Sequence, residues 1–212
     1  MRKLAWYILN KLQIASIIQL VLKSGLKDDG WYRSYYTKQA VNRKNEPIPW
    51  CTYPFIKFIE NRLKKDFDVF EYGCGNSTLW YADKVKSITS VEHHNEWYHL
   101  VSKKLPENAK LIYKQLVYDA EYSQAVFEEN KKYHIIIIDG RDRVNSVKNA
   151  INALSENGIV VFDNTDRTQY QKGIDILLKN GFRKIDFEGL SPVTAQNNMT
   201  SIFYRKNNCL DI

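Results

Sequence analysis

The residues best suited to chemistry begin with a glycine-containing run after an apolar stretch. Residues 69–71 read as a strand that ends in Glu71, and the loop Gly73-Cys74-Gly75 leads on to Asn76-Ser77-Thr78. Glycines let a backbone approach a ligand closely, and a helix that begins at Ser77 or Thr78 would offer free N–H groups to an anion. The third glycine of the dinucleotide-binding pattern is absent, because position 78 is Thr. The loop alone is also compatible with an ordinary tight turn.

A second acid stands at the spacing of a nucleoside-binding site. Glu92 ends the next apolar run, and in Rossmann-type sites an acid about 20 residues after the first strand binds the ribose hydroxyls. His93 and His94 follow it, but adjacent side chains of a strand point in different directions and no cysteine accompanies them. We therefore expect packing or surface roles for the histidines, with His93 near the adenosine, rather than a metal site.

These residues need a parallel sheet to bring them together. From Asp66 onward, apolar runs at 69–71, 87–92, 109–113, 134–139 and 158–163 alternate with helical patterns at 77–84, 95–105, 120–131 and 144–154. This alternation predicts right-handed crossovers and an α/β fold. The run Ile135–Ile138 has no polar alternation, as expected of a central strand covered on both faces.

The end of the chain has a different pattern. After a helix near 169–179, residues 183–187 and 201–204 are strand-like with no helix between them. This pattern predicts a hairpin that closes the sheet. We predict a Rossmann-like, seven-stranded, mainly parallel sheet with an antiparallel terminal hairpin, preceded by an N-terminal helical extension.

The two acids and their loop resemble motifs I and II of class I S-adenosylmethionine-dependent methyltransferases, over residues 66–206. The resemblance implies strand order 3-2-1-4-5-7-6, with strand 7 antiparallel. It also implies that Glu71 and the loop hold the methionine end and Glu92 the ribose. The residues that we expect to bind the cofactor are Glu71, Gly73, Cys74, Gly75, Asn76, Ser77, Glu92, His93 and Asp139. Residues 47–54, taken with 138–143, are similar to a group of bacterial methyltransferase-like proteins with no established substrate.

A polar cluster follows the fourth and fifth strands. Asp139 ends one and Asp163-Asn164 the other, and open α/β proteins bind ligands at this edge of the sheet. Two acids and an amide are hard ligands that suit Mg²⁺, and the arrangement is similar to catechol-type O-methyltransferases, which implies Asp139, Asp163 and Asn164 as metal ligands. Two alternatives stay open: Asp139 acts as a metal-free general base, or the acids form ion pairs with the arginines that follow them. Asp139 and Asp163 are the catalytic candidates.

Three further features are less specific. We interpret Cys74 as a small side chain that fills space in the loop, since no general base is identifiable beside it. Adenine contacts are expected around residues 116–119. Six aromatic residues that precede the core would either fold over the site as a lid or pack beneath the N-terminal helix: Trp31, Tyr32, Tyr35, Tyr36, Trp50 and Tyr53.

The N-terminal region is expected to be separate from the core. We divide the chain into residues 1–54, a helix with an aromatic-rich segment, and residues 55–212, the cofactor domain, whose first helix starts near Pro54. Residues 4–22 read as one helix with a wide apolar face. It would pack on the domain, pair with a second subunit in a homodimer, or lie on a membrane surface beside Lys3, Lys11 and Lys23.

Composition sets the remaining limits. No stretch is long and apolar enough to cross a bilayer, and three separated cysteines argue for a reducing, cytoplasmic compartment and against a zinc site. The formal net charge of +7 comes from scattered cations, so we expect no nucleic-acid partner. The sequence predicts methyl transfer to a hydroxyl of a small molecule, sugar or glycan. The alternatives are a non-catalytic nucleoside-binding module and a nucleic-acid methyltransferase.

Overall fold

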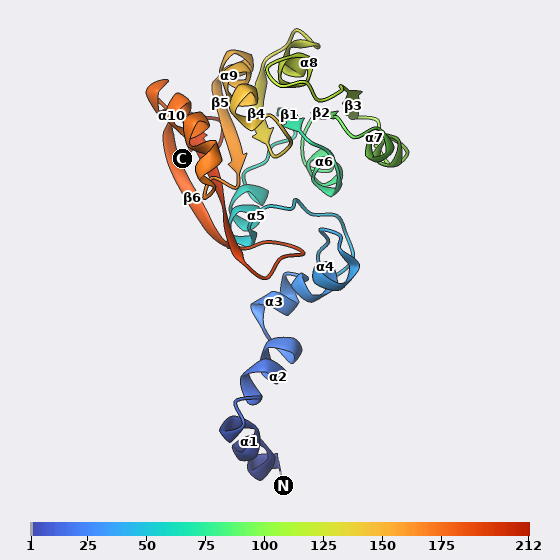
Figure 1. Cartoon of the computed structure of the whole chain (residues 1–212), viewed down its shortest axis with the longest axis vertical. Helices are drawn as coiled ribbons and strands as arrows, with labels where there is room; N and C mark the ends of the chain where they lie inside the picture. The colour runs from blue at the N-terminus through green and yellow to red at the C-terminus, as the bar shows by residue number, and fades with distance from the viewer. Residues whose placement is uncertain (1) are drawn as a thin grey trace.

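One mixed sheet organises the body of the protein (Figure 1). The computed structural model describes residues 2–212, and over this range it contains seven strands in the order β3-β2-β1-β4-β5-β7-β6. The strands are β1 (Asp68–Tyr72), β2 (Ser87–Glu92), β3 (Ala109–Tyr113), β4 (Tyr133–Ile138), β5 (Leu154–Asp163), β6 (Arg183–Leu190) and β7 (Asn197–Tyr204). Strands β1 to β5 pair in parallel, whereas β7 runs antiparallel to both β5 and β6. The predicted order and terminal hairpin are confirmed.

Helices cover both faces of this sheet. In chain order, the helices of the described residues are α1 (Arg2–Lys11), α2 (Ala15–Leu22), α3 (Gly25–Asp28), α4 (Trp31–Thr37), α5 (Tyr53–Glu60), α6 (Asn76–Ala82), α7 (Asn95–Ser102), α8 (Glu121–Gln124), α9 (Arg143–Ala153) and α10 (Gln171–Lys179). The helix expected over 120–131 is only α8 and a 3₁₀ turn, Ala125–Phe127. The buried side chains lie within this short stretch, and the charged residues after it have no apolar face to bury.

The central strand β4 separates two apolar layers. Ile135 and Ile137 pack into one layer with residues of α5 and α6, such as Phe55 and Tyr81. Ile136 and Ile138 pack into the other, with residues of α8, α9 and α10. The unbroken isoleucine run is therefore buried on both faces, as the sequence predicts, because alternate side chains of a strand point to opposite sides.

The segment before α5 folds over the end of the sheet where the glycine loop lies. Ala40, Ile48 and Cys51 are buried in the layer around α5. The Asn76 side-chain amide donates to the carbonyl oxygen of Ala40 at 2.8 Å, and the Thr52 N–H donates to Thr200 Oγ1 at 3.1 Å. These bonds fix residues 40–52 against the first turn of α6 and against β7.

The first two helices form a stalk that projects from the body (Figure 1). The single helix expected over residues 4–22 is broken between Lys11 and Ala15, where Gln13 has a φ of 57°. No single helix among residues 2–212 is long and apolar enough to cross a membrane. The helical segments 3–11 and 15–28 meet that criterion together, but they are bent by 112°.

Candidate functional site

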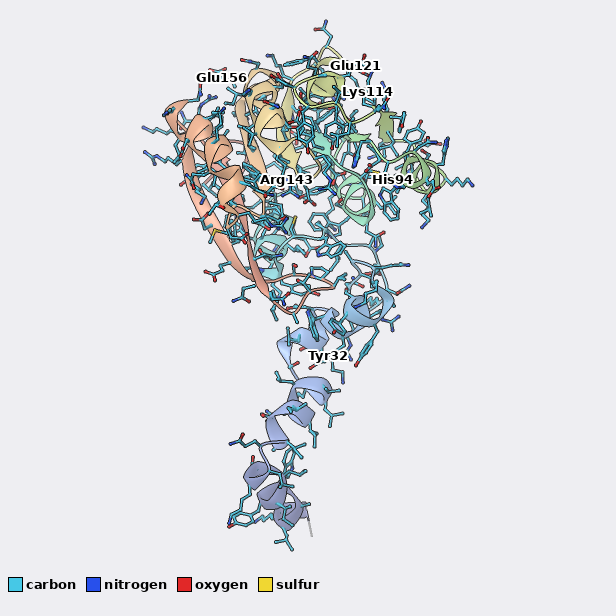
Figure 2. All side chains as sticks on the ribbon, in the orientation of Figure 1. Tyr32, His94, Lys114, Glu121, Arg143 and Glu156 are labelled. Carbon is cyan, nitrogen blue, oxygen red and sulfur yellow. The ribbon has the colours of Figure 1, made fainter. Side chains whose placement is uncertain are left out.

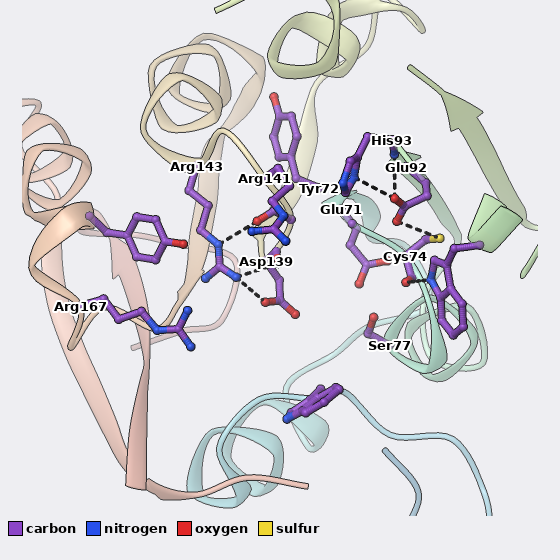
Figure 3. A pocket seen from close by; sticks show the side chains of 15 residues that line it. Glu71, Tyr72, Cys74, Ser77, Glu92, His93, Asp139, Arg141, Arg143 and Arg167 are labelled. Atoms are coloured by element: carbon purple, nitrogen blue, oxygen red, sulfur yellow. Dashed lines mark hydrogen bonds and ion pairs between the residues drawn. The ribbon is translucent and has the colours of Figure 1, made fainter. Parts of the chain in front are cut away.

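A cleft of about 490 Å³ lies at the carboxyl ends of the central parallel strands (Figure 3). Its walls come from the loops after β1, β2, β4 and β5 and from the segment before α5. The lining residues are Trp50, Glu71, Tyr72, Gly73, Cys74, Ser77, Glu92, His93, Trp97, Asp139, Gly140, Arg141, Arg143, Arg167 and Tyr170. The volume lies within the range typical of small-molecule sites.

The glycine loop forms the floor of this cleft. Gly73 has a φ of +94°, a left-handed conformation that side chains disfavour, and its N–H donates to the Val91 carbonyl at 2.9 Å. The indole N–H of Trp97, from α7, donates to the carbonyl of Cys74 at 2.8 Å. Trp97 therefore fixes the loop from the side of β2. The sequence reasoning missed this residue, whose only signal is an aromatic side chain in the first turn of the helix after Glu92.

Glu71 lies behind the loop in a shell of hydroxyl groups. It is buried, and its Oε2 accepts hydrogen bonds from Thr78 Oγ1 at 2.6 Å and from Ser90 Oγ at 2.8 Å. Burial raises the pKa of this carboxyl to about 6, and the hydroxyl donors, including Ser77, oppose that rise. The donors hold the carboxylate in one orientation at the edge of the cleft.

Glu92 is fixed through one of its two carboxylate oxygens. Its Oε1 accepts from the backbone N–H groups of His93 and His94, both at 2.7 Å. Its Oε2 faces the Sγ of Cys74 at 3.6 Å, which is a weak partner. Figure 3 shows this carboxylate lying between His93 and Cys74. Oε2 consequently keeps acceptor capacity for hydroxyl donors in the cleft.

Asp139 faces the cleft from the end of β4, with 27% of its side chain exposed. Arg143 donates to its Oδ1 at 3.1 Å and to the carbonyl of Gly140 at 2.9 Å. Burial raises the pKa of Asp139 to about 6, while the Arg143 charge opposes that rise. The carboxyl group of Asp163 is more deeply buried, and desolvation together with the Asp139 charge raises its pKa to about 8. At neutral pH, Asp139 is the ionised member of the pair.

The donor set proposed for Mg²⁺ does not fit a metal ion. Arg143 places its guanidinium 3.3 Å from Asn164 Oδ1 and 4.0 Å from Asp163 Oδ2, in addition to its bond with Asp139. Asp163 Oδ1 accepts from Thr200 Oγ1 at 2.6 Å. The three expected ligands are thus arranged around an arginine, which supplies the positive charge itself and would repel a cation. The ion-pair alternative describes this arrangement.

The structure brings most of the predicted cofactor residues to the cleft. Glu71, Gly73, Cys74, Ser77, Glu92, His93 and Asp139 line it. The side-chain amide of Asn76 is turned away toward Ala40. Gly75 lies at the start of α6, where a Cβ would be 3.5 Å from the Trp97 ring. Asp163 and Asn164 are buried and do not line the cleft.

Two further sequence interpretations concern Cys74 and the aromatic residues that precede the core. Burial and the charge of Glu92 raise the pKa of the Cys74 thiol, so this cysteine is no nucleophile. Of the six aromatic residues considered for a lid, Trp50 alone lines the cleft. Tyr53 is buried in the core, and Trp31 stacks on Tyr35 within α4 at 5.1 Å between ring centroids. Figure 2 shows Tyr32 at the base of the stalk, away from the cleft.

Comparisons with known proteins find one matching family model and solved structures of similar fold. Residues 70–165 match the family model described as a methyltransferase domain. An rRNA methylase from Streptococcus thermophilus aligns with a TM-score of 0.57 at 12% identity, over 72% of this chain and 97% of its own. A protein from Streptococcus mutans solved in complex with SAH gives 0.53 at 12%, over 70% and 94%. A precorrin 8w decarboxylase from Methanobacterium thermoautotrophicum gives 0.55 at 15%, over 80% and 97%. No curated protein matches the chain.

Proposed function

We propose that this chain is a class I methyltransferase that takes its methyl group from S-adenosylmethionine and transfers it to a hydroxyl oxygen of a small molecule, sugar or glycan. One observation carries the proposal: the glycine loop, Glu92 and Asp139 line a single cleft. The glycine loop and Glu92 form an arrangement suited to a nucleoside, and Asp139 is a candidate base on the opposite wall. The S. mutans protein of similar fold was solved with SAH, which favours the same cofactor here.

The residues present fit this cofactor. The left-handed Gly73 leaves the backbone of the loop uncovered by a side chain, and Glu92 Oε2 has free acceptor capacity for the two ribose hydroxyls. His93 lies within 2.9 Å of Glu92 Oε1 and so limits how that carboxylate can rotate. We infer that Glu92 binds the ribose and that the loop 73–75 lies along the methionine end.

Bound in this position, the cofactor would supply an electrophilic methyl group attached to sulfur. The acceptor oxygen forms the new bond to carbon as the carbon–sulfur bond breaks, and the hydroxyl proton must leave in the same step. Asp139 accepts that proton at its carboxylate, since it is ionised at neutral pH and reaches the cleft. Arg143 holds the carboxylate in place through Oδ1. Positioning and proton removal are all that this displacement requires of the protein.

The part of the cleft beyond Asp139, as seen from the glycine loop, is lined by side chains that suit a polar or anionic acceptor. Arg167 and Tyr170 follow β5, and Arg141 follows Asp139, so two cations and an aromatic ring face the same space. Trp50 also lines the cleft, and such flat rings suit a sugar or a phenol. We infer a hydroxylated acceptor that carries a polar or negatively charged group.

Calorimetric titration of S-adenosylmethionine tests the first half of the proposal. We expect micromolar binding to the intact chain and a loss of at least about tenfold in affinity for Glu92→Ala, because the ribose hydroxyls lose their acceptor. Glu107→Ala, an exposed acid on the body, is the matched control and should bind normally. Absence of binding to the intact chain would overturn the proposal.

Transfer itself is tested with a cofactor labelled in its methyl group. Incorporation into hydroxylated sugars or phenols, with loss in Asp139→Asn but retained cofactor binding, is the expected result. Binding without transfer to any acceptor class would favour the non-catalytic module. Transfer to RNA instead would favour the nucleic-acid alternative. The S. thermophilus protein of similar fold is named an rRNA methylase.

A further inference from the structure

The stalk exposes many large apolar side chains that the body of the protein does not cover. On α1, Leu4, Tyr7 and Ile8 are between 49% and 64% exposed. On α2, Ile17 and Leu22 are 59% and 62% exposed, and Ala15 is the one side chain of that helix that is buried. Large apolar side chains gathered in this number on one projecting segment indicate an interaction site.

The α2 helix is amphipathic in a specific way. Its two polar side chains, Ser16 and Gln19, are three residues apart and so lie on one face of the helix. Lys23, four residues after Gln19, continues that face just beyond the last turn. Ile17 and Leu20 lie on another face at the same spacing. This narrow polar stripe beside a wide apolar face suits a helix that lies in a lipid–water interface.

The charges of the stalk favour one kind of covering surface. Before Asp28 the sequence contains no acidic residue, but it contains the cations Arg2, Lys3, Lys11, Lys23 and Lys27. A second copy of the same stalk would bring these cations together, and the resulting repulsion would oppose pairing. Anionic headgroups would attract all of them.

Aromatic residues add a further feature of interfacial helices. Trp6 and Tyr7 lie next to each other on α1 and are 41% and 57% exposed. The ammonium group of Lys11 lies 5.1 Å from the centroid of the Tyr7 ring, so cation and ring sit at the same level of the helix. Amphipathic rings and snorkelling lysines occupy the headgroup region of bilayers.

We propose that the stalk, together with residues 23–27 that follow it, binds an anionic lipid surface with α2 lying in the interface. The proposal is independent of the methyl-transfer reaction. Lipid binding by the stalk would place the cleft close to the membrane. Residues 40–52, which follow the stalk in the chain, are hydrogen-bonded to Asn76 and Thr200 beside the cleft. An active site tethered in this way would act near the membrane surface.

Co-sedimentation of the full-length chain with vesicles tests the proposal. We expect binding to vesicles of three parts phosphatidylcholine to one part phosphatidylglycerol, weaker binding in 1 M NaCl, and little binding to phosphatidylcholine alone. Lys11→Gln with Lys23→Gln should weaken binding by roughly 25-fold, at about fivefold for each cation. Ile17→Glu with Leu20→Glu should abolish it.

Matched controls separate the local effect from changes in net charge or folding. Lys103→Gln with Lys104→Gln removes two exposed cations from the body and should leave vesicle binding unchanged. Retained binding of S-adenosylmethionine, or an unchanged circular dichroism melt if the cofactor does not bind, would show that the stalk variants remain folded.

Three results would overturn the proposal. Equal binding to charged and uncharged vesicles would remove the role of the cations. Failure to bind vesicles, combined with a dimer by light scattering that Ile17→Glu dissociates, would identify a second copy as the covering surface. Resistance of the vesicle-bound chain to extraction by alkaline carbonate would indicate that the two bent helices insert across the bilayer instead.

Discussion

The guanidinium group of Arg143 donates to Asp139 at 3.1 Å from a side chain that is only 8% exposed. The same group also bonds the carbonyl oxygens of Asp139 and Gly140 and lies against the end of β5. One buried cation therefore joins the two strand ends that carry the candidate catalytic acids. This relationship decides between the chemical alternatives for the cluster, because a guanidinium already supplies the charge that a metal would bring.

Methyl transfer is therefore expected to be independent of divalent metal. Treatment with excess EDTA should change the affinity for S-adenosylmethionine and the transfer rate by less than about twofold, since no step relies on a metal-bound oxygen. The measurement is the transfer assay with EDTA, with and without added Mg²⁺. A large loss that Mg²⁺ alone restores would show that Arg143 moves aside for a metal ion.

Replacing Arg143 with lysine should destabilise the domain by about 2–4 kcal/mol, because a single ammonium cannot bond the carbonyls of both strand ends. Urea unfolding monitored by circular dichroism gives this change in the free energy of unfolding. Arg141→Lys, at an exposed neighbouring position, is the control and should stay within about 0.5 kcal/mol of the parent. Equal effects of the two substitutions would contradict the joining role of Arg143.

The transfer rate should rise with pH through an apparent pKa near 6. Burial raises the pKa of Asp139 to about 6, and only the ionised carboxylate can accept the hydroxyl proton. The rate is then lost below pH 6 and reaches a plateau above it. Asp139→Asn should lower the rate by roughly 10²–10⁴-fold and abolish this pH dependence, while cofactor affinity is kept. An Asn variant that keeps the parent rate would exclude Asp139 as the base.

Asp163 should make the protein less stable as the pH rises. Its folded-state pKa, about 8, lies above the ordinary value, so the folded state holds a proton that the unfolded state has lost. The stabilising contribution is complete below pH 4 and is lost progressively toward pH 8. Asp163→Asn keeps an acceptor for Thr200 and should remove much of this dependence, as seen in thermal melts between pH 5 and 8.5. Parallel curves for the two proteins would show that Asp163 is ionised throughout.

Much of the fold could be predicted because its signals are local. The isoleucine run of β4 and the alternation of apolar runs with helical patterns specify a covered parallel sheet, and the missing helix between β6 and β7 specifies the hairpin. The prediction of one helix over residues 4–22 was wrong, since residues 10–14 contain no proline or glycine to mark the break. The break depends on the single left-handed residue Gln13.

The site was predictable where chain position alone determines it. Glu71, Glu92 and Asp139 each lie within one residue of the carboxyl end of a strand, so the topology brings them to one edge. The role of Arg143 depends on a side chain that reaches across to β5, and that of Trp97 on a helix that turns back over the loop. Neither direction can be read from spacing, which is why the metal and ion-pair alternatives could not be separated beforehand.

The loops after β1 and β4 touch at Gly140, and this contact provides the sharpest test of the backbone geometry of the site. A Cβ at position 140 would lie 2.8 Å from the backbone nitrogen of Gly73 and would clash with the Tyr122 hydroxyl. Gly140→Ala should therefore cost about 1–3 kcal/mol of stability and weaken cofactor binding, because the glycine loop must shift to make room. Gly25→Ala is the matched control, since nothing lies within 4 Å of its Cβ, and it should be neutral or slightly stabilising. Urea unfolding and calorimetric titration measure the two effects. If Gly140→Ala behaves like the control in both, the two loops are not in contact and the cleft is wider than the structure shows.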